Sequence, residues 1–287
     1  MRIGAHISSA GGPLKVFDRA AAIGAEAIQL FISAPQQWKI PALTPDVTRS
    51  FSEAREQAGM PVFFHGVYLI NLASQDEALL ARSVESLVSY MAFGAEMGSE
   101  GTIFHVGSHL GRGLDVACLA QIGRLLRTVL ERSPAESKLI LECNAGQGGC
   151  IGGTFGELGR LIREAGGDPR LAVCLDTGHA FAMGYDLRSD GGCEAAVAEF
   201  DREISLERLV AVHANDSKQP LGGLRDRHEN IGDGHIGLAG FAAVMRHPAF
   251  AHVPFLLEVP GLTGLGPDSE NVMRLKAIRA GVGLRAE

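Results

Sequence analysis

The chain has 287 residues, of which 46% are apolar and 21% charged, and this balance excludes an intrinsically disordered protein. The formal net charge of −7 argues against a nucleic-acid partner when taken alone, although cations bound by clustered carboxylates would reverse the charge locally. No run of 18 uncharged apolar residues predicts a membrane span, and MRIGAHISSAGG at the start lacks the apolar core of a secretory signal.

Eight short apolar runs, rich in β-branched residues, recur along the chain at a spacing of roughly 35 residues. Runs of this length and composition predict buried strands. They cover residues 2–6, 27–31, 61–65, 101–105, 138–142, 171–176, 209–213 and 254–258.

Segments between these runs have the apolar period of amphipathic helices. The clearest are residues 14–24, 77–98, 116–131, 155–166 and 269–280. Strands that alternate with helices form parallel sheets, and eight such units predict a closed (β/α)8 TIM barrel of the α/β class. An open doubly wound sheet is the alternative, but no G-x-G-x-x-G follows the first strand. We expect one domain over residues 1–287, because no linker or charge block divides the chain.

Almost every predicted strand ends on a residue that can bind a metal ion. Seven of the eight have this property, and the exception is the second, which ends in Phe31. The endings are His6, His65, His105, Glu142, Asp176, His213 and Glu258. Because active sites of these barrels lie at the carboxyl ends of the strands, the pattern predicts a polynuclear metal centre at one mouth.

Two short motifs add further candidate ligands. In D-T-G-H, His179 lies one turn after Asp176, so both side chains can face the same cleft. In D-R-H, Asp226 and His228 can face one ion if the segment is extended. Imidazole and carboxylate ligands suit zinc, and manganese or iron less well. Without His6, the nine candidates are too many for one ion and enough for two or three with a shared carboxylate.

Eight motifs, in order along almost the whole chain, carry a resemblance to a known family. They are GAHISSAGG (4–12), HGVYLINLAS (65–74), FHVGSHLG (104–111), ECNAGQG (142–148), LDTGHAFAMGYDL (175–187), HANDSK (213–218), DRHENIGDGHIG (226–237) and LLEVPG (256–261). The sequence resembles the endonuclease IV family of apurinic/apyrimidinic endonucleases, within the xylose-isomerase-like TIM barrels.

The resemblance implies three zinc ions, with Mn²⁺ as an alternative at one or more sites. The first ion would be held by His65, His105 and Glu142. The second would be held by Glu142 as a bridge, with Asp176, His213 and Glu258. The third would be held by His179, Asp226 and His228. All nine positions have the residue type of the family.

The substrate that the resemblance implies is duplex DNA with an abasic site. The reaction is hydrolysis of the phosphodiester on the 5′ side of the lesion, which leaves a 3′-hydroxyl and a 5′-deoxyribose phosphate. Members of the family also trim blocked 3′ ends. We expect Glu142 to be the catalytic residue, because it would join two of the ions and orient the attacking water.

Four residues are predicted to bind DNA. Tyr68 matches the family's tyrosine in the loop after the third strand. Gln36 occupies a wedge position at which well-known members have arginine, so it lacks that residue's charge and stacking. Lys218 and Arg227 lie in loops after strands and can contact phosphates. His6 has no assigned metal and is either a positioning residue or a packed structural one.

Two other functions remain open at this point. A sugar isomerase or epimerase on the same barrel would use one or two metals, so the set around His179 discriminates against it. A metal-stabilised protein that binds DNA lesions without cleaving them is the non-enzymatic alternative. Five cysteines without a C-x-x-C pair favour the cytoplasm. We expect a monomer with no protein partner.

Overall fold

The barrel is built from eight parallel strands among residues 1–40 and 43–281, which are the residues that the computed structural model describes. The strands are β1 (Ile3–His6), β2 (Ile28–Leu30), β3 (Val62–His65), β4 (Gly101–Phe104), β5 (Leu139–Glu142), β6 (Leu171–Asp176), β7 (Leu209–His213) and β10 (Phe255–Leu257). They close in the order β1-β10-β7-β6-β5-β4-β3-β2. Pairing of Ile3 with Phe255 joins the first strand to the last, so the TIM barrel is confirmed and the open sheet was the wrong alternative.

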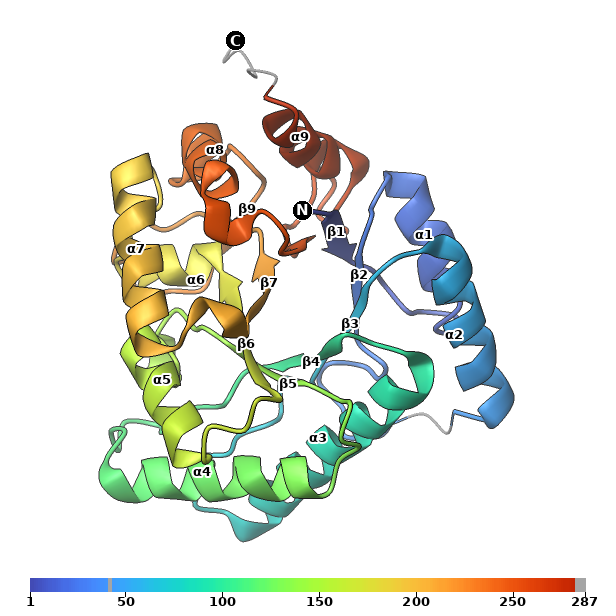
Figure 1. Ribbon diagram of the computed structural model, residues 1–287, viewed down its shortest axis with the longest axis vertical. Helices are drawn as coiled ribbons and strands as arrows, with labels where there is room; N and C mark the ends of the chain where they lie inside the picture. The colour runs from blue at the N-terminus through green and yellow to red at the C-terminus, as the bar shows by residue number, and fades with distance from the viewer. Residues whose placement is uncertain (41–42, 282–287) are drawn as a thin grey trace.

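Helices surround the barrel, as Figure 1 shows. They are α1 (Lys15–Ile23), α2 (Pro45–Ala58), α3 (Glu77–Met97), α4 (Val116–Glu131), α5 (Phe155–Glu164), α6 (Thr177–Ala182), α7 (Asp190–Glu203), α8 (Gly237–Arg246) and α9 (Ser269–Arg279). Short 3-10 helices cover Gln147–Gly149, Leu206–Arg208 and Pro248–Phe250. A two-stranded antiparallel sheet of β8 (Asp216–Ser217) and β9 (His228–Glu229) lies outside the barrel.

The five predicted helices are confirmed, with ends that differ by up to two residues. Sequence reasoning missed α2, α6, α7 and α8. Helix α2 buries few side chains, among them Phe51, so its apolar stripe is weak, although Thr44 caps it and Pro45 opens it. Helix α7 has two glycines in its first turn, which weaken helix propensity.

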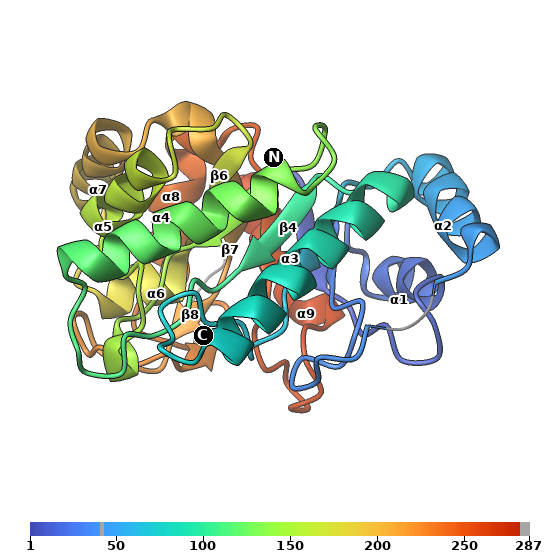
Figure 2. The same cartoon turned by 90° about the horizontal axis from the view of Figure 1, so that it is seen from below.

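The mouth of the barrel, formed by the carboxyl ends of its strands, lies on one side of the molecule. In Figure 2 the N-terminus, which leads into β1, lies at the upper edge, and β8, which follows the end of β7, lies at the lower edge. The carboxyl ends of the strands therefore face the lower edge in that view. No helix among the described residues is long and apolar enough to cross a membrane.

Helix α9 is fastened to the start of the barrel through Glu26. The Glu26 carboxylate accepts from Arg279 (Nη1 to Oε2, 2.6 Å), lies 3.2 Å from Lys276 Nζ, and accepts the backbone N–H of Ile3 at 3.0 Å. The hydrogen bond from Arg279 is the main reason that the pKa of Glu26 falls to about 2.

Glu26→Gln should lower the melting temperature by about 2 °C at neutral pH, since partly exposed ion pairs contribute about 1 kcal/mol. A depressed carboxyl pKa stabilises the fold above the unfolded value, so the difference should be full above pH 4.5 and shrink as the pH falls toward 2. Thermal melts of both proteins across this range measure it. Glu53→Gln, at an exposed position on α2, is the control, and a difference independent of pH would contradict the prediction.

Candidate metal centre

The interior of the barrel has an apolar layer beneath a polar one. Buried residues, most of them two positions before a candidate ligand, form a cluster of their own, separate from the core that packs against the helices. It contains Ala27, Phe63, Ile103, Ile140, Ala172, Cys174, Ala211 and Leu256. Residues two apart on a strand face the same side, so the next interior position on each strand lies one layer closer to the mouth.

Each strand delivers one polar side chain to this upper layer. The eight residues are His6, Gln29, His65, His105, Glu142, Asp176, His213 and Glu258. The second strand, the exception in the sequence pattern, contributes the amide of Gln29 to this layer, and Phe31 lies beyond the strand. His105 and Glu258 lie one residue past the ends of β4 and β10.

The first group of candidate ligands is His65, His105 and Glu142, whose donor atoms all lie within 4.8 Å of one another. Glu142 Oε2 is 3.0 Å from His65 Nε2 and 3.5 Å from His105 Nε2. His65 Nδ1 lies 2.8 Å from the carbonyl oxygen of Gly66, to which an Nδ1–H donates. That bond leaves His65 Nε2 as the nitrogen that can bind a metal.

The second group is centred on His213. Its Nδ1 lies 3.1 Å from Glu142 Oε1, 3.4 Å from Glu258 Oε2 and 3.8 Å from Asp176 Oδ2. The donor atoms of these four side chains also lie within 4.8 Å of one another. The two oxygens of Glu142 thus face different groups, Oε2 the first and Oε1 the second.

The third group brings together the two short motifs. Asp226 Oδ1 lies 3.3 Å from His179 Nε2 and 3.2 Å from His228 Nε2. The set whose donor atoms all lie within 4.8 Å of one another is Asp176, His179 and His228, with Asp176 Oδ2 at 3.5 Å from His228 Nε2, and Asp226 lies outside that set. Asp176 Oδ1 accepts the backbone N–H of His179, which fixes the start of α6. The two histidines therefore lie between carboxylates of β6 and of the segment that leads into β9.

Unpartnered nitrogens show that these residues fit a cation. Within residues 1–40 and 43–281, the buried Nε2 atoms of His179 and His228 make no hydrogen bond of good geometry, although each lies 3.2 to 3.3 Å from the carboxylate oxygen Oδ1 of Asp226. Burial raises the pKa of Glu142, but the surrounding histidines, His105, His213 and His179, together outweigh burial and hold that pKa well below its usual range. An anionic carboxylate that contacts several imidazoles is the donor set that divalent zinc prefers.

Three residues that sequence reasoning did not select support this layer. Gln29 and Asn215 are fully buried and bond to candidate ligands. Asn215 donates to Asp176 Oδ2 at 2.7 Å, and its Oδ1 accepts the backbone N–H of Glu258 at 2.8 Å. Asn144 Nδ2 lies 3.1 Å from His105 Nδ1. A polar residue inside an otherwise apolar strand was the available signal for Gln29.

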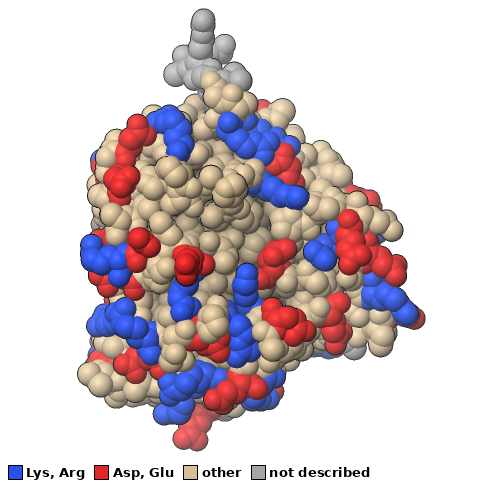
Figure 3. Space-filling view, in the orientation of Figure 1, with Lys and Arg blue, Asp and Glu red and all other residues tan. Residues whose placement is uncertain are grey.

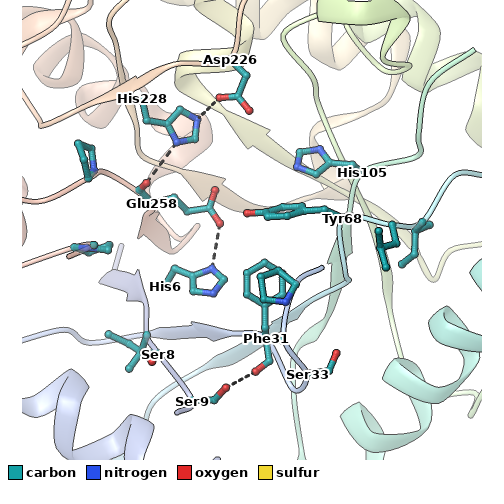
Figure 4. Close-up of a pocket in the computed structure, with 18 of the residues that line it drawn as sticks. His6, Ser8, Ser9, Phe31, Ser33, Tyr68, His105, Asp226, His228 and Glu258 are labelled. Atoms are coloured by element: carbon teal, nitrogen blue, oxygen red, sulfur yellow. Dashed lines mark hydrogen bonds and ion pairs between the residues drawn. The ribbon is translucent and has the colours of Figure 1, made fainter. Parts of the chain in front are cut away.

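His6 contacts the centre through a carboxylate. Its Nδ1 lies 3.2 Å from Glu258 Oε1, an interaction drawn in Figure 4. Burial lowers the pKa of His6, even though Glu258 opposes the shift. Its ring also packs on Phe31, with centroids 4.5 Å apart. The contact with Glu258 agrees with His6 as a positioning residue, and the packing on Phe31 agrees with His6 as a structural residue.

The centre opens into a cleft of about 1690 Å³. Tyr68 lines it and is 53% exposed. The ring of Tyr68 crosses the cleft between Phe31 and His105 in Figure 4, with centroid distances of 5.3 Å and 6.0 Å. Burial and then the Glu258 carboxylate raise the pKa of Tyr68, so its hydroxyl remains a hydrogen-bond donor at neutral pH.

Known proteins resemble the chain over nearly its whole length. A family model described as a xylose isomerase-like TIM barrel matches residues 17–279. A protein of Aquifex aeolicus named "Probable endonuclease 4" is 38% identical over 271 residues, which cover 94% of this chain and 96% of that one. A protein of Chlorobium phaeobacteroides with the same name is 42% identical over 261 residues, covering 90% and 92%. The chain belongs to the endonuclease IV family.

A solved endonuclease IV, from Thermus thermophilus, has the same architecture. It superposes with a TM-score of 0.84 at 34% identity, over 98% of both chains. A D-tagatose 3-epimerase-like protein superposes at 0.72 with 19% identity, over 98% of this chain and 97% of that one. At that identity the likeness to epimerases extends to the fold alone.

Two of the four residues predicted to bind DNA line the cleft of this endonuclease IV family member. Tyr68 and the exposed Arg227 line it, whereas Gln36 and Lys218 are not among the described residues that do. Gln36 is exposed after β2, and its loop is tied to the Tyr68 loop by a 2.9 Å bond from Tyr68 N to the Pro35 oxygen. Lys218 Nζ lies 3.8 Å from Glu229 Oε2.

Charge on the face shown in Figure 3 is mixed. Lysine, arginine, aspartate and glutamate side chains are interspersed over its lower half and along its margins, and uncharged residues cover the upper middle. Figure 2 places the start of β1 on this side, so the face lies opposite the mouth that holds the candidate ligands. Among the described residues, it has no continuous basic patch.

Proposed function

We propose that this protein is a metal-dependent apurinic/apyrimidinic endonuclease. It hydrolyses the phosphodiester 5′ to an abasic site in duplex DNA, leaves a 3′-hydroxyl and a 5′-deoxyribose phosphate, and repairs blocked 3′ ends. The observation that carries the proposal is the convergence of three candidate ligand groups at one barrel mouth, in a chain of the endonuclease IV family.

The cofactors proposed are three zinc ions, with Mn²⁺ as an alternative at one or more sites. His65 and His105 with Glu142 hold one ion, and Glu142, Asp176, His213 and Glu258 hold another. His179, Asp226 and His228 hold the third, where the nearness of Asp226 Oδ1 to both Nε2 atoms supports Asp226 as the carboxylate ligand. Mixed imidazole and carboxylate donors suit zinc.

Bound divalent ions would polarise the phosphoryl oxygens and activate water for an in-line displacement. The chain's own residues provide the geometry. Glu142 fixes the position of the first ligand group relative to the second, because one of its carboxylate oxygens faces the first group and the other oxygen faces the second. The Tyr68 hydroxyl can donate a hydrogen bond to a substrate in the cleft, and its half-exposed ring can pack in the gap left by the missing base.

A nicking assay on a duplex with a single abasic site tests the activity, together with elemental analysis of the purified protein. We expect strand cleavage 5′ to the lesion and about three zinc or manganese ions per chain. Tight binding without cleavage by metal-loaded protein would favour the non-enzymatic lesion binder. A stoichiometry below two metals, with turnover of ketoses, would favour the sugar epimerase.

Gln36→Ala should weaken binding to the abasic duplex by a few-fold and leave the cleavage rate at saturating DNA unchanged. Gln36 lies on the exposed loop tied to Tyr68 and away from the candidate ligands, so it contributes to substrate binding and not to the chemical step. Fluorescence anisotropy and single-turnover cleavage measure the two quantities.

The matched control is Gln57→Ala, on the exposed surface of α2. A Gln36→Ala protein with normal affinity but slow single-turnover cleavage would contradict this role. We also infer that Lys218 and Arg227 contact backbone phosphates, and that the protein is a cytoplasmic monomer with one domain over residues 1–287. The last six of these residues lie outside the described part of the chain.

A further inference from the structure

Gln29 is the single amide among the eight residues of the polar layer, and its side chain is fully buried. It lies on β2, opposite His6 in the pairing register between β1 and β2. The sequence motifs that relate this chain to endonuclease IV do not include it. A buried amide is tolerated in a protein interior when its oxygen and its N–H groups each have a hydrogen-bond partner.

The oxygen of Gln29 meets His213. Gln29 Oε1 lies 2.7 Å from His213 Nε2. An amide oxygen can only accept, so Nε2 carries the proton and Nδ1 has the free lone pair. That Nδ1 is the atom surrounded by the carboxylates of Glu142, Glu258 and Asp176.

The nitrogen of Gln29 meets the opposite side of the same group. Gln29 Nε2 donates to Glu258 Oε1 at 2.5 Å and lies 2.8 Å from His6 Nδ1. The bond occupies one oxygen of Glu258 and leaves the other, Oε2, at 3.4 Å from His213 Nδ1. An amide satisfies both neighbours, whereas a carboxylate at this position would repel Glu258.

We propose that Gln29 is a positioning residue for the second metal group. It holds His213 in the tautomer that presents Nδ1, and it turns Glu258 so that Oε2 faces the same point. Hydrogen-bond partners of metal ligands fix ligand orientation in this way. The inference rests on the proposed function, because it assigns His213 and Glu258 to a metal.

Two substitutions separate the two contacts. Gln29→Glu keeps an acceptor for His213 and loses the donor to Glu258, while Gln29→Leu removes both. Loss of such a partner weakens metal affinity by about 10- to 100-fold, so both variants should release one zinc ion more readily. Competition with a chromophoric chelator measures this release independently of nicking. Gln57→Leu, on the surface of α2, is the control and should bind zinc as the unaltered protein does.

The tautomer of His213 can be measured directly by NMR in the unaltered protein. Long-range ¹H–¹⁵N correlation spectra of ¹⁵N-histidine-labelled protein should show His213 protonated at Nε2 and unprotonated at Nδ1. This pattern should persist in Gln29→Glu and be lost in Gln29→Leu. Protonation at Nδ1 in the unaltered protein would overturn the inference even if Gln29→Leu does not fold.

The outcomes also separate this inference from the proposed function. If the unaltered protein binds about three metals and cleaves abasic DNA, and both Gln29 variants keep its zinc affinity, the role of Gln29 is wrong and the function stands. If the unaltered protein binds no metal, the proposed function fails and the role of Gln29 fails with it.

Discussion

Glu142→Gln should abolish nicking and release metal. The substitution replaces one anionic oxygen with an amide N–H₂, which cannot bind a cation, at a side chain whose oxygens face His65 on one side and His213 on the other. Metal ions supply several kcal/mol of stabilisation to a transition state of this kind. We therefore expect the cleavage rate to fall by about 10³-fold or more. Single-turnover cleavage and elemental analysis measure the two effects.

The neutral amide has nearly the same shape, so the barrel itself should fold. Circular dichroism would confirm this, and Glu53→Gln on the exposed surface of α2 controls for the loss of one carboxylate. Glu142→Asp retains the charge but is shorter by one methylene, so it should reach at most one of the two groups. Normal turnover and full metal content in Glu142→Gln would show that this residue joins no metal sites.

Prolonged chelation should remove nicking completely and lower the melting temperature. A ligand present at a thousand times its Kd stabilises the folded state by about 4 kcal/mol, so its removal should lower the melting temperature by roughly 10 °C. The effect should be large here because stripping the ions leaves carboxylates and imidazoles crowded in a buried layer. Adding Zn²⁺ or Mn²⁺ separately to the stripped protein would identify the metal that restores cleavage.

The control for chelation is the same reagent saturated with zinc beforehand. It should leave both cleavage and the melting temperature unchanged. Cleavage that survives chelation in protein shown to be metal-free would remove the ions from the reaction. An unchanged melting temperature with lost cleavage would instead place the metals at a site that the fold does not depend on.

The position of the site in the fold could be predicted because the last residue of several strands is also a residue that faces the barrel interior. His65, Glu142, Asp176 and His213 are each the last residue of a strand and also face the interior. Reading the final residue of every apolar run therefore located the mouth. Helix α2 escaped because it buries Phe51 as its one apolar side chain, and helix α7 escaped because two glycines in its first turn weaken its helix propensity.

The same rule could not find Gln29, because the apolar run continues to Phe31, one residue past the end of β2, and the interior position comes two residues earlier. Its polarity inside an apolar run was a signal, but the pairing of β2 with β1 is what places it in the polar layer beside His6. Asn215 escaped for a different reason, since its role depends on contacts with Asp176 and Glu258 from distant parts of the chain. The nearness of Asp176 to His228 was equally invisible, because it follows from the fold around β9.

The second group draws its side chains from the ends of four strands, and Glu258 comes directly after β10, the last barrel strand in the sequence. During synthesis, this set cannot exist until Glu258 has left the ribosome. Ion uptake at that position therefore belongs to the end of biogenesis, after barrel closure. Shortage of metal in the cell would accumulate a closed, empty apoprotein and not an arrested nascent fragment.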